Sequence, residues 1–167
     1  MSRSTSLILA ALATGAIALG AYTIVGIKPA APAVTFVSIQ GEQITIASLR
    51  GKVVLVNFWA TDCVTCIREM PDIVATYNKY RAQGFETIAV AMKYDPPNYV
   101  LDYAEKTRPP FKVALDPLGE LARAFGDVKL TPTTFIIDRQ GRLVMRILGA
   151  PDFAKLHMLL EEKLRES

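Results

Sequence analysis

The stretch from Val53 to Trp59 is apolar apart from Asn57, and it constrains the fold more than any other feature. A continuous apolar run of this length indicates a strand buried on both faces, because a half-exposed strand would alternate apolar and polar residues. A helical pattern follows at about residues 63–81, and a second apolar strand at 86–92. This succession of strand, helix and strand indicates a right-handed parallel crossover. The sequence therefore predicts an α/β fold.

The other elements predict a central mixed sheet with helices on both faces. Strands at 35–39 and 43–46 flank a Gln-Gly-Glu turn, which predicts an N-terminal β-hairpin. Pro71 lies inside the predicted helix and predicts a kink there, because proline removes a backbone hydrogen bond. The remaining patterns predict helices at 96–107, 118–125 and 154–165, a strand at 112–115, and an antiparallel hairpin of 133–137 with 143–147.

The N-terminal segment is the most apolar part of the chain, whose mean hydropathy is +0.26. No charge occurs between Leu7 and Ile27, and Arg3 and Lys28 flank this stretch. At about 1.5 Å per residue, a helix of this length crosses a hydrocarbon core of about 30 Å. The pattern favours an uncleaved transmembrane anchor. A signal peptide cleaved near Ala31-Pro-Ala33 and a buried soluble helix are the alternatives.

The predicted organisation has four parts. These are a short cytoplasmic N-terminus at 1–6, the anchor at 7–27, a linker at 28–33 and one domain at 34–167. The flanking positive charges predict a single pass through the inner (cytoplasmic) membrane, with the domain in the periplasm or another extracytoplasmic space. About 134 residues suffice for one domain with a sizeable core. The weak net charge of +3 and the lack of a basic run argue against a nucleic-acid partner.

The chain has two cysteines, Cys63 and Cys66, at the junction between the apolar strand and the predicted helix. A structural disulfide is one interpretation, although so small a ring contributes only about 2 kcal/mol before strain. A metal site is a second interpretation. It needs four ligands, however, and the single histidine, His157, is distant in the sequence. The favoured interpretation is redox chemistry.

A dithiol at the start of a helix suits this chemistry. Unpaired N–H groups and the positive end of the helix dipole favour a thiolate at Cys63, which lowers its pKa below the free value of about 8.5. Cys66, one turn further in, is placed to resolve a mixed disulfide. An extracytoplasmic location supplies disulfide substrates. The spacing therefore predicts thiol–disulfide exchange.

Further motifs follow one another in a specific order along the chain. They are Gly51-Lys-Val-Val-Leu-Val-Asn57, Asn57-Phe-Trp-Ala60, Cys63-Val-Thr-Cys66, Glu69-Met-Pro71, Thr131-Pro-Thr-Thr-Phe-Ile-Ile-Asp138 and the Asp138-Arg-Gln-Gly141 turn. In this order they resemble the membrane-anchored TlpA/ResA-type thiol–disulfide oxidoreductases of the thioredoxin superfamily. The resemblance covers about residues 34–166 and implies a thioredoxin-like fold.

The resemblance also implies roles for individual residues. Cys63 matches the attacking cysteine and Cys66 the resolving one. Pro132 matches a cis-proline whose loop packs beside the dithiol and presents backbone to an extended client segment. Thr131 is expected to touch the client or the sulfur, and Trp59 to belong to the wall of the site. The resemblance implies no metal and no cofactor other than the disulfide between the two cysteines.

Glu69 is the expected proton acceptor. Helical geometry places it one turn beyond Cys66. Thioredoxin carries an aspartate for this purpose in the preceding strand, but here the matching residue is Asn57, which cannot titrate. The family pattern has a glutamate where Glu69 stands, which implies that Glu69 takes the proton of Cys66. A solvated carboxylate paired with Arg68 is the alternative.

Three features concern the surroundings of the dithiol. Asp62 replaces the family's tryptophan, and we expect it to cap the helix and to raise the pKa of Cys63, which predicts a fairly reducing couple. Thr65 replaces the family's proline, and a hydrogen bond from it to sulfur would act in the opposite direction. The segment Tyr94-Asp-Pro-Pro-Asn98 is either a wall near the dithiol or, as we favour, a turn into the next helix.

The sequence thus predicts a membrane-anchored reductase of disulfides in envelope proteins, with apocytochromes among the candidate clients. A membrane-embedded electron donor would recharge the oxidised dithiol. A thiol peroxidase is an alternative enzyme, but the peroxiredoxin pattern needs a proline and a threonine where Val56 and Ala60 stand. A copper- or metal-binding thioredoxin-like module is the alternative from another class. Such modules use two cysteines separated by three residues and a histidine, which differs from the spacing here.

Overall fold

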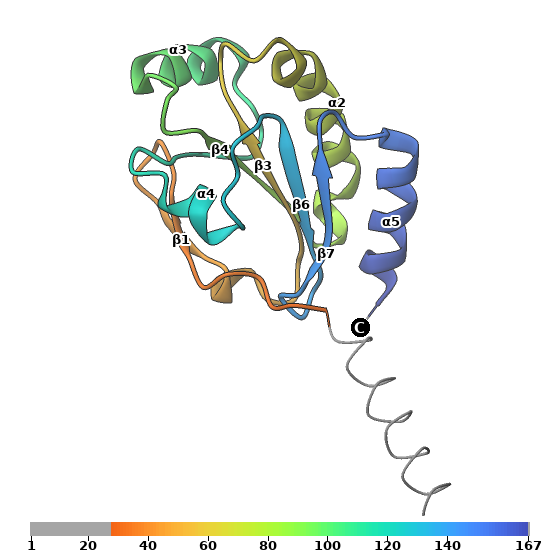
Figure 1. Cartoon of the computed structure of the whole chain (residues 1–167). Helices are drawn as coiled ribbons and strands as arrows, with labels where there is room; N and C mark the ends of the chain where they lie inside the picture. The colour runs from red at the N-terminus through yellow and green to blue at the C-terminus, as the bar shows by residue number, and fades with distance from the viewer. Residues whose placement is uncertain (1–27, 167) are drawn as a thin grey trace, which may run out of the picture.

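The computed structural model describes residues 28–166 (Figure 1). The predicted N-terminus at 1–6 and the predicted anchor at 7–27 lie outside this range. Within residues 28–166, no helix combines the length and the apolar character needed to cross a bilayer.

The domain is built around one five-stranded sheet in the order β5–β4–β3–β6–β7. Its strands are β3 (Val53–Trp59), β4 (Phe85–Ala91), β5 (Lys112–Leu115), β6 (Thr133–Ile137) and β7 (Leu143–Leu148). Neighbouring strands β3, β4 and β5 run parallel, whereas β6 is antiparallel to both β3 and β7. The predicted central mixed sheet is confirmed, and β5 and β6 have the predicted bounds.

Two short strands, β1 (Thr35–Val37) and β2 (Gln43–Thr45), form the N-terminal hairpin, which the 3-10 turn η1 (Ala47–Leu49) follows. The hairpin covers the outer edge of β5. Ser38 forms a bridge with Ala114, and the N–H of Ile39 donates to the carbonyl of Val113 at 2.9 Å. The backbone groups of this edge strand are thereby paired within the chain rather than left open to another chain.

The helices are α2 (Val64–Tyr80), α3 (Pro97–Thr107), α4 (Glu120–Ala124) and α5 (Phe153–Arg165), with the 3-10 turn η2 (Arg81–Gln83) after α2. α2 continues through Pro71. α4 begins later than the predicted residue 118. The reason is the buried carboxylate of Asp116, which accepts hydrogen bonds from the N–H groups of Leu121 and Ala122 at 3.1 and 2.9 Å. This cap from outside the helix fixes where α4 starts.

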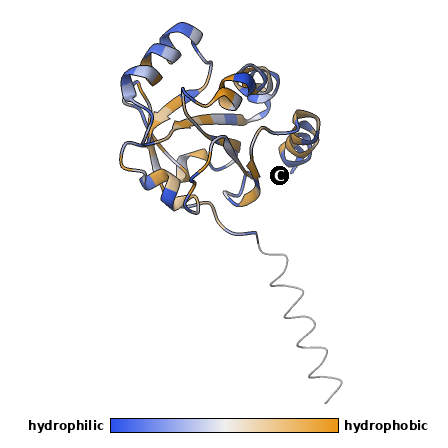
Figure 2. Ribbon diagram, turned by 45° about the horizontal axis from the view of Figure 1, so that its top comes forward, coloured by the Kyte–Doolittle hydropathy of each residue, from blue (hydrophilic) through white to orange (hydrophobic). Residues whose placement is uncertain are grey.

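The alternation of side chains along β3 divides the core into two layers. Even-numbered residues such as Phe58 pack against β1, β2 and α4, where Phe58 meets Phe125 edge-on at 5.4 Å between ring centroids. Odd-numbered residues face α2 and α5, where Leu55 packs with Leu156 and Leu160. Figure 2 shows the corresponding pattern, with apolar strands between helices that carry polar residues on their outer faces. Both faces of the sheet are therefore covered, as the apolar run predicts.

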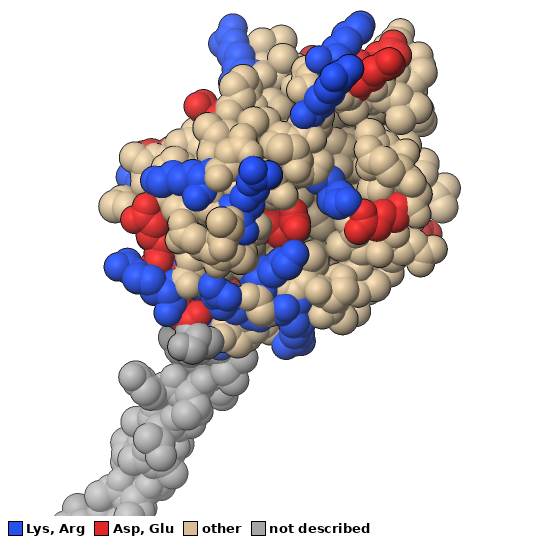
Figure 3. All heavy atoms as spheres, turned by 180° about the vertical axis from the view of Figure 1, so that it is seen from behind, with Lys and Arg blue, Asp and Glu red and all other residues tan. Residues whose placement is uncertain are grey.

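Exposed ion pairs add little to this core. Nζ of Lys129 lies 3.0 Å from Oδ2 of Asp127, and Nζ of Lys79 lies 3.4 Å from Oε1 of Glu161. Basic and acidic side chains also lie close together on the face shown in Figure 3. Because exposed pairs contribute at most about 1 kcal/mol each, the stability of the domain rests on its two apolar layers.

The described chain begins beside the β6–β7 turn. Ala30 forms a bridge with Arg142, and the N–H of Leu143 donates to the carbonyl of Pro29 at 2.8 Å. The turn itself is held by Asp138, whose carboxylate accepts a 2.8 Å hydrogen bond from Nε of Arg142. The linker therefore joins the domain at one end of the sheet.

Candidate active site

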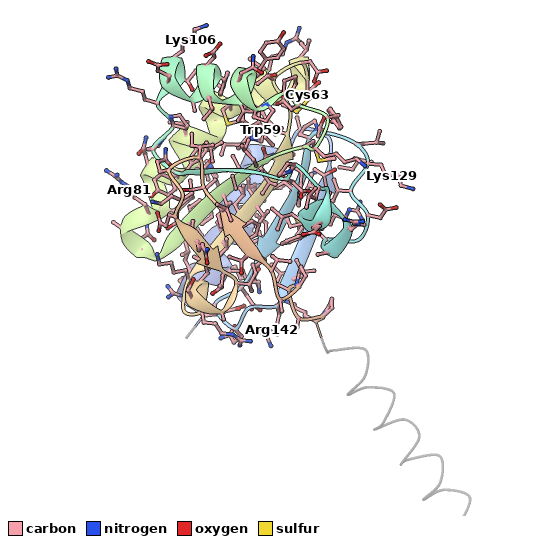
Figure 4. The ribbon with its side chains drawn as sticks, turned by 90° about the vertical axis from the view of Figure 1, so that its left-hand side faces the viewer. Trp59, Cys63, Arg81, Lys106, Lys129 and Arg142 are labelled. Carbon is pink, nitrogen blue, oxygen red and sulfur yellow. A yellow bond between two sulfur atoms is a disulfide. The ribbon has the colours of Figure 1, made fainter. Side chains whose placement is uncertain are left out.

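Three loops meet at the opposite end of the sheet. The N–H of Met92, just after β4, donates to the carbonyl of Trp59 at 3.0 Å. The register pairs Phe58 with Thr133, so Pro132 enters β6 beside the end of β3. Figure 4 shows Cys63 and Trp59 at this end and Arg142 at the other. The parts of the chain that follow β3 and β4 and precede β6 thus surround the cysteines.

The two cysteines form a disulfide, with their Cα atoms 5.2 Å apart. The N–H of Cys63 donates to the carbonyl of Ala60 at 3.2 Å and closes a turn, after which α2 begins. Sγ of Cys63 accepts a 3.2 Å hydrogen bond from the N–H of Cys66. Cys63 is partly exposed, whereas Cys66 is fully buried. Cys63 is therefore partly open to solvent at the helix N-terminus, while Cys66 is enclosed.

Asp62 is not the helix cap, and this prediction is wrong. The N-cap is Cys63, whose backbone is extended and whose own sulfur accepts the hydrogen bond from the first turn. The Ala60–Cys63 turn moves the helix start one residue beyond the expected position, and the side chain of Asp62 is exposed. Thr65 is also exposed, and within the described part of the chain it donates no hydrogen bond to either sulfur.

Trp59 supports the site from inside rather than facing a client. Its side chain is fully buried, in the same apolar cluster as Cys66 and Met70. The indole ring packs on Tyr103 of α3 with 5.0 Å between ring centroids. A side chain at this depth holds α2 and α3 together beneath the disulfide, and it offers no surface to an extended peptide.

Glu69 is buried together with Asn57 under the first turns of α2. Only 3% of Glu69 is exposed and none of Asn57. Nδ2 of Asn57 donates to Oε1 of Glu69 at 2.9 Å and to Oγ1 of Thr134, on β6, at 3.0 Å. The alternative of a solvated carboxylate paired with Arg68 is wrong, because the packing of α2 on β3 turns Glu69 inward. Sequence reasoning did not find Thr134.

Burial raises the pKa of Glu69 from its ordinary 4.5 to about 7, against a smaller lowering by the hydrogen bond from Asn57. Oε2 of Glu69 and Oδ1 of Asn57 have no hydrogen-bond partner among the described residues. A carboxyl group that titrates near neutral pH beside a buried thiol position can both accept and release a proton.

The loop before β6 carries the other predicted site residues. The peptide bond between Thr131 and Pro132 is cis. Pro132 is buried and Thr131 partly exposed. The hydroxyl of Tyr94 lies 3.2 Å from Oγ1 of Thr131. Thr131 is thus partly open to solvent, and its hydroxyl contacts Tyr94.

The segment after β4 belongs to the site as well. The favoured interpretation of 94–98 as a turn is correct in that α3 begins at Pro97. The carboxylate of Asp95, however, holds Thr61 in the loop before the cysteines. It accepts hydrogen bonds from the N–H of Thr61 at 2.7 Å and from the Thr61 hydroxyl at 2.5 Å. Sequence reasoning missed this contact. The available signal was that both loops leave the same edge of adjacent parallel strands.

His157 is a residue of α5 that contacts α2, and it does not lie at the cysteines. Its Nε2 is 2.9 Å from Oγ1 of Thr76, a residue about 15 Å further along α2 than Cys66. Among residues 28–166, no group of three or more His, Cys, Asp or Glu side chains could hold a metal ion.

Comparison with known proteins agrees with this geometry. The Redoxin family model matches residues 27–160. Thiol-disulfide oxidoreductase ResA of Bacillus thuringiensis subsp. konkukian is 34% identical over 139 residues, which cover 79% of this chain and 75% of the relative. ResA of Geobacillus thermodenitrificans is 35% identical over 127 residues, which cover 76% and 72%.

Solved structures give the same result. A thioredoxin-like protein from Neisseria meningitidis superposes with a TM-score of 0.78 at 35% identity, covering 84% of this chain and 93% of that one. A thiol:disulfide interchange protein from Chlorobium tepidum superposes with a TM-score of 0.75 at 29% identity, covering 83% and 98%. The chain therefore belongs to the Redoxin family and is a ResA/TlpA-like thiol–disulfide oxidoreductase of the thioredoxin superfamily.

Proposed function

We propose that this protein is a membrane-anchored reductase that opens disulfides in proteins of the cell envelope. The apolar segment 7–27 would hold it in the inner membrane, with the domain in the periplasm or another extracytoplasmic space. The geometry of the domain supports this arrangement. The linker joins it beside Arg142, and the dithiol lies at the other end, away from that junction (Figure 4). A client in the aqueous phase can then reach the cysteines.

The observation that carries the proposal is the unequal environment of the two sulfurs. Cys63 is partly exposed, and its Sγ accepts a hydrogen bond from an N–H of the first turn of α2, which favours its thiolate. Cys66 is enclosed and reaches only what is already bonded to Cys63. Cys63 is therefore the attacking cysteine in this proposal, and Cys66 is the resolving one.

The exchange proceeds in two steps. The Cys63 thiolate attacks one sulfur of the client disulfide, so that an S–S bond forms between enzyme and client while the client's other sulfur leaves as a thiolate. The Cys66 thiolate then attacks Sγ of Cys63. The disulfide between the two cysteines forms, the mixed disulfide breaks, and the second client thiolate is released. Two electrons have passed from the dithiol to the client.

Glu69 accepts the proton of the Cys66 thiol before the second step. Cys66 must lose its proton before it can attack, and its burial keeps water from taking that proton directly. Glu69 follows one turn later on the same helix, and its pKa of about 7 lets it accept a proton near neutral pH. The 2.9 Å hydrogen bond from Asn57 holds the accepting carboxylate in place.

The oxidised enzyme needs two electrons for another turnover. A dithiol donor embedded in the same membrane would supply them by the reverse exchange, reducing the Cys63–Cys66 disulfide while itself becoming oxidised. Envelope proteins with paired cysteines are the proposed clients, and apocytochromes are candidates among them.

Trapping in the host tests the proposal directly. In the full-length chain with Cys66→Ala, the mixed disulfide on Cys63 cannot be resolved. Adducts should therefore accumulate, and mass spectrometry should identify them as envelope proteins with paired cysteines. The control with both Cys63→Ala and Cys66→Ala should carry none. The absence of adducts on Cys66→Ala, or adducts only with cytoplasmic proteins, would contradict the proposal.

A further inference from the structure

Two consecutive residues, Tyr94 and Asp95, contact both loops that enclose the cysteines. They follow β4, whose last residue pairs with Trp59 at the end of β3. Tyr94 contacts the loop before β6, and Asp95 contacts the loop before α2. Among the described residues, no other two consecutive residues link these loops through one hydrogen bond to Thr61 and one to Thr131.

Asp95 holds the dithiol loop by two hydrogen bonds to one residue. Its carboxylate accepts the N–H of Thr61 at 2.7 Å and the Thr61 hydroxyl at 2.5 Å. Only 5% of Asp95 is exposed, so water competes little for these bonds. Bonds to a charged acceptor are about twice as strong as neutral ones. Thr61 lies within the Ala60–Cys63 turn, so Asp95 fixes the backbone that delivers Cys63 to the helix N-terminus.

Tyr94 holds the facing wall of the site, which is the loop of Thr131 and Pro132 before β6. Its hydroxyl is 3.2 Å from Oγ1 of Thr131, next to Pro132. Half of Tyr94 is exposed, so part of this side chain faces solvent. The exposed ring of Tyr94 would also offer a client bound at this loop a rigid apolar surface.

The backbone joining the two contacts is stiff. The N–H of Asp95 donates to the carbonyl of Met92 at 2.9 Å. Pro96 and Pro97 follow directly, and a proline restricts the backbone of the residue before it. This backbone therefore holds the two contacts at a fixed separation.

We propose that Tyr94 and Asp95 form a two-sided clamp that sets the spacing between the loop before α2 and the loop before β6. Asp95 acts as a positioning residue for Cys63, and Tyr94 as a specificity-determining residue that positions Thr131. The inference rests on the proposed function, because it takes the client to lie between the cysteines and the Thr131–Pro132 loop. The partner it predicts is an extended polypeptide around the disulfide, which touches both walls. A small disulfide reaches the accessible sulfur without touching the far wall.

Two disulfide substrates distinguish the effect of the Tyr94 contact from the effect of the Asp95 contact. One is a synthetic peptide closed by a disulfide between cysteines two residues apart, with four residues on each side. The other is hydroxyethyl disulfide. Single-turnover reduction of each probe by the reduced full-length protein, measured over a range of probe concentrations, gives the maximal single-turnover rate constant, denoted kcat below, and the half-saturating probe concentration, denoted KM. The alkylation rate of Cys63 by iodoacetamide, measured at one pH, reports the reactivity of the sulfur independently of any client.

Tyr94→Phe keeps the ring and removes the hydroxyl. We expect KM for the peptide to rise about threefold or more, as the loss of one hydrogen bond allows. The kcat, the hydroxyethyl disulfide rate and the alkylation rate should stay within about twofold. Tyr99→Phe, at an exposed tyrosine on α3, is the matched control and should change none of these values. Equal slowing of both probes by Tyr94→Phe would overturn the assignment of Tyr94 to the client side.

Asp95→Ala removes both bonds to Thr61, and we expect kcat for both probes and the alkylation of Cys63 to fall about tenfold or more. Asp95→Asn should restore most of this loss, because an amide can accept from the N–H and donate to the hydroxyl. If Asp95→Ala fails to fold, Thr61→Val, which removes the hydroxyl bond alone, should still reduce kcat several-fold. Unchanged rates in Asp95→Ala or Thr61→Val would refute the clamp. Failure of the unmodified protein to reduce the peptide would count instead against the proposed function.

Discussion

Replacing Glu69 by glutamine should stabilise the oxidised protein at high pH and leave its stability at low pH unchanged. The glutamine amide has nearly the shape of the protonated carboxyl group and can accept the same hydrogen bond from Asn57. It also brings a donor to a site where Oδ1 of Asn57 has no hydrogen-bond partner among the described residues. The substitution therefore removes the buried charge and little else.

The size of the effect follows from the raised pKa. Glu69 titrates at about 7 in the folded protein against an ordinary 4.5, so the folded state binds more protons than the unfolded state between these values. Stability contributed by the protonated carboxyl is fully present below about pH 4.5 and is lost as pH rises through about 7. At about 1.4 kcal/mol per pKa unit, the loss amounts to roughly 3 kcal/mol. Glu69→Gln should avoid it.

Urea unfolding of the oxidised protein at pH 4.5, 6 and 8.5 measures this difference. The free-energy difference between Glu69→Gln and the unmodified protein should grow from near zero to about 3 kcal/mol across this range, with equal denaturant slopes. Glu105→Gln, at an exposed carboxylate on α3, is the control and should show no such trend. A difference independent of pH would refute the assignment of a raised pKa to Glu69.

Three further substitutions test the surroundings of the site and the core. Asn57→Ala should destabilise the domain by about 1–3 kcal/mol in urea. It should also shift the pH-dependent loss of stability caused by Glu69 to higher pH, because the hydrogen bond from Asn57 lowers the pKa of Glu69. Phe125→Ala opens a cavity among the core aromatic rings and should cost about 3–5 kcal/mol by thermal unfolding, while Cys63 keeps its alkylation rate. Gly119→Ala should cost about 1–2 kcal/mol, since φ is +69° there and a Cβ would lie 2.9 Å from Cδ of Lys93. Adding Lys93→Ala should recover only the steric part of that cost.

The fold follows largely from patterns local in the sequence. The apolar run at 53–59 identifies the central strand, and β5 and β6 have the bounds that their side chains predict. The cysteine pair lies at the junction of strand and helix as its spacing indicates. These features depend on periodicity and turn residues, which each segment carries by itself.

The sequence predictions are wrong or incomplete where contacts between distant segments determine the local structure. Asp62 has a better capping side chain than Cys63, yet Thr61 is held by Asp95 from another loop and the helix starts one residue later. The spacing places Glu69 beside Cys66, but its burial depends on how α2 packs over Asn57 of β3. Such contacts cannot be read from a single segment.

The proposed exchange requires the two cysteines to differ in reactivity, and alkylation of the reduced protein measures this difference directly. A brief pulse of iodoacetamide at pH 7, followed by peptide mapping, gives the rate at each sulfur. Accessible Cys63, with its N–H donor, should react at least about tenfold faster than enclosed Cys66. Equal rates, or faster reaction at Cys66, would contradict the assignment of Cys63 as the attacking cysteine.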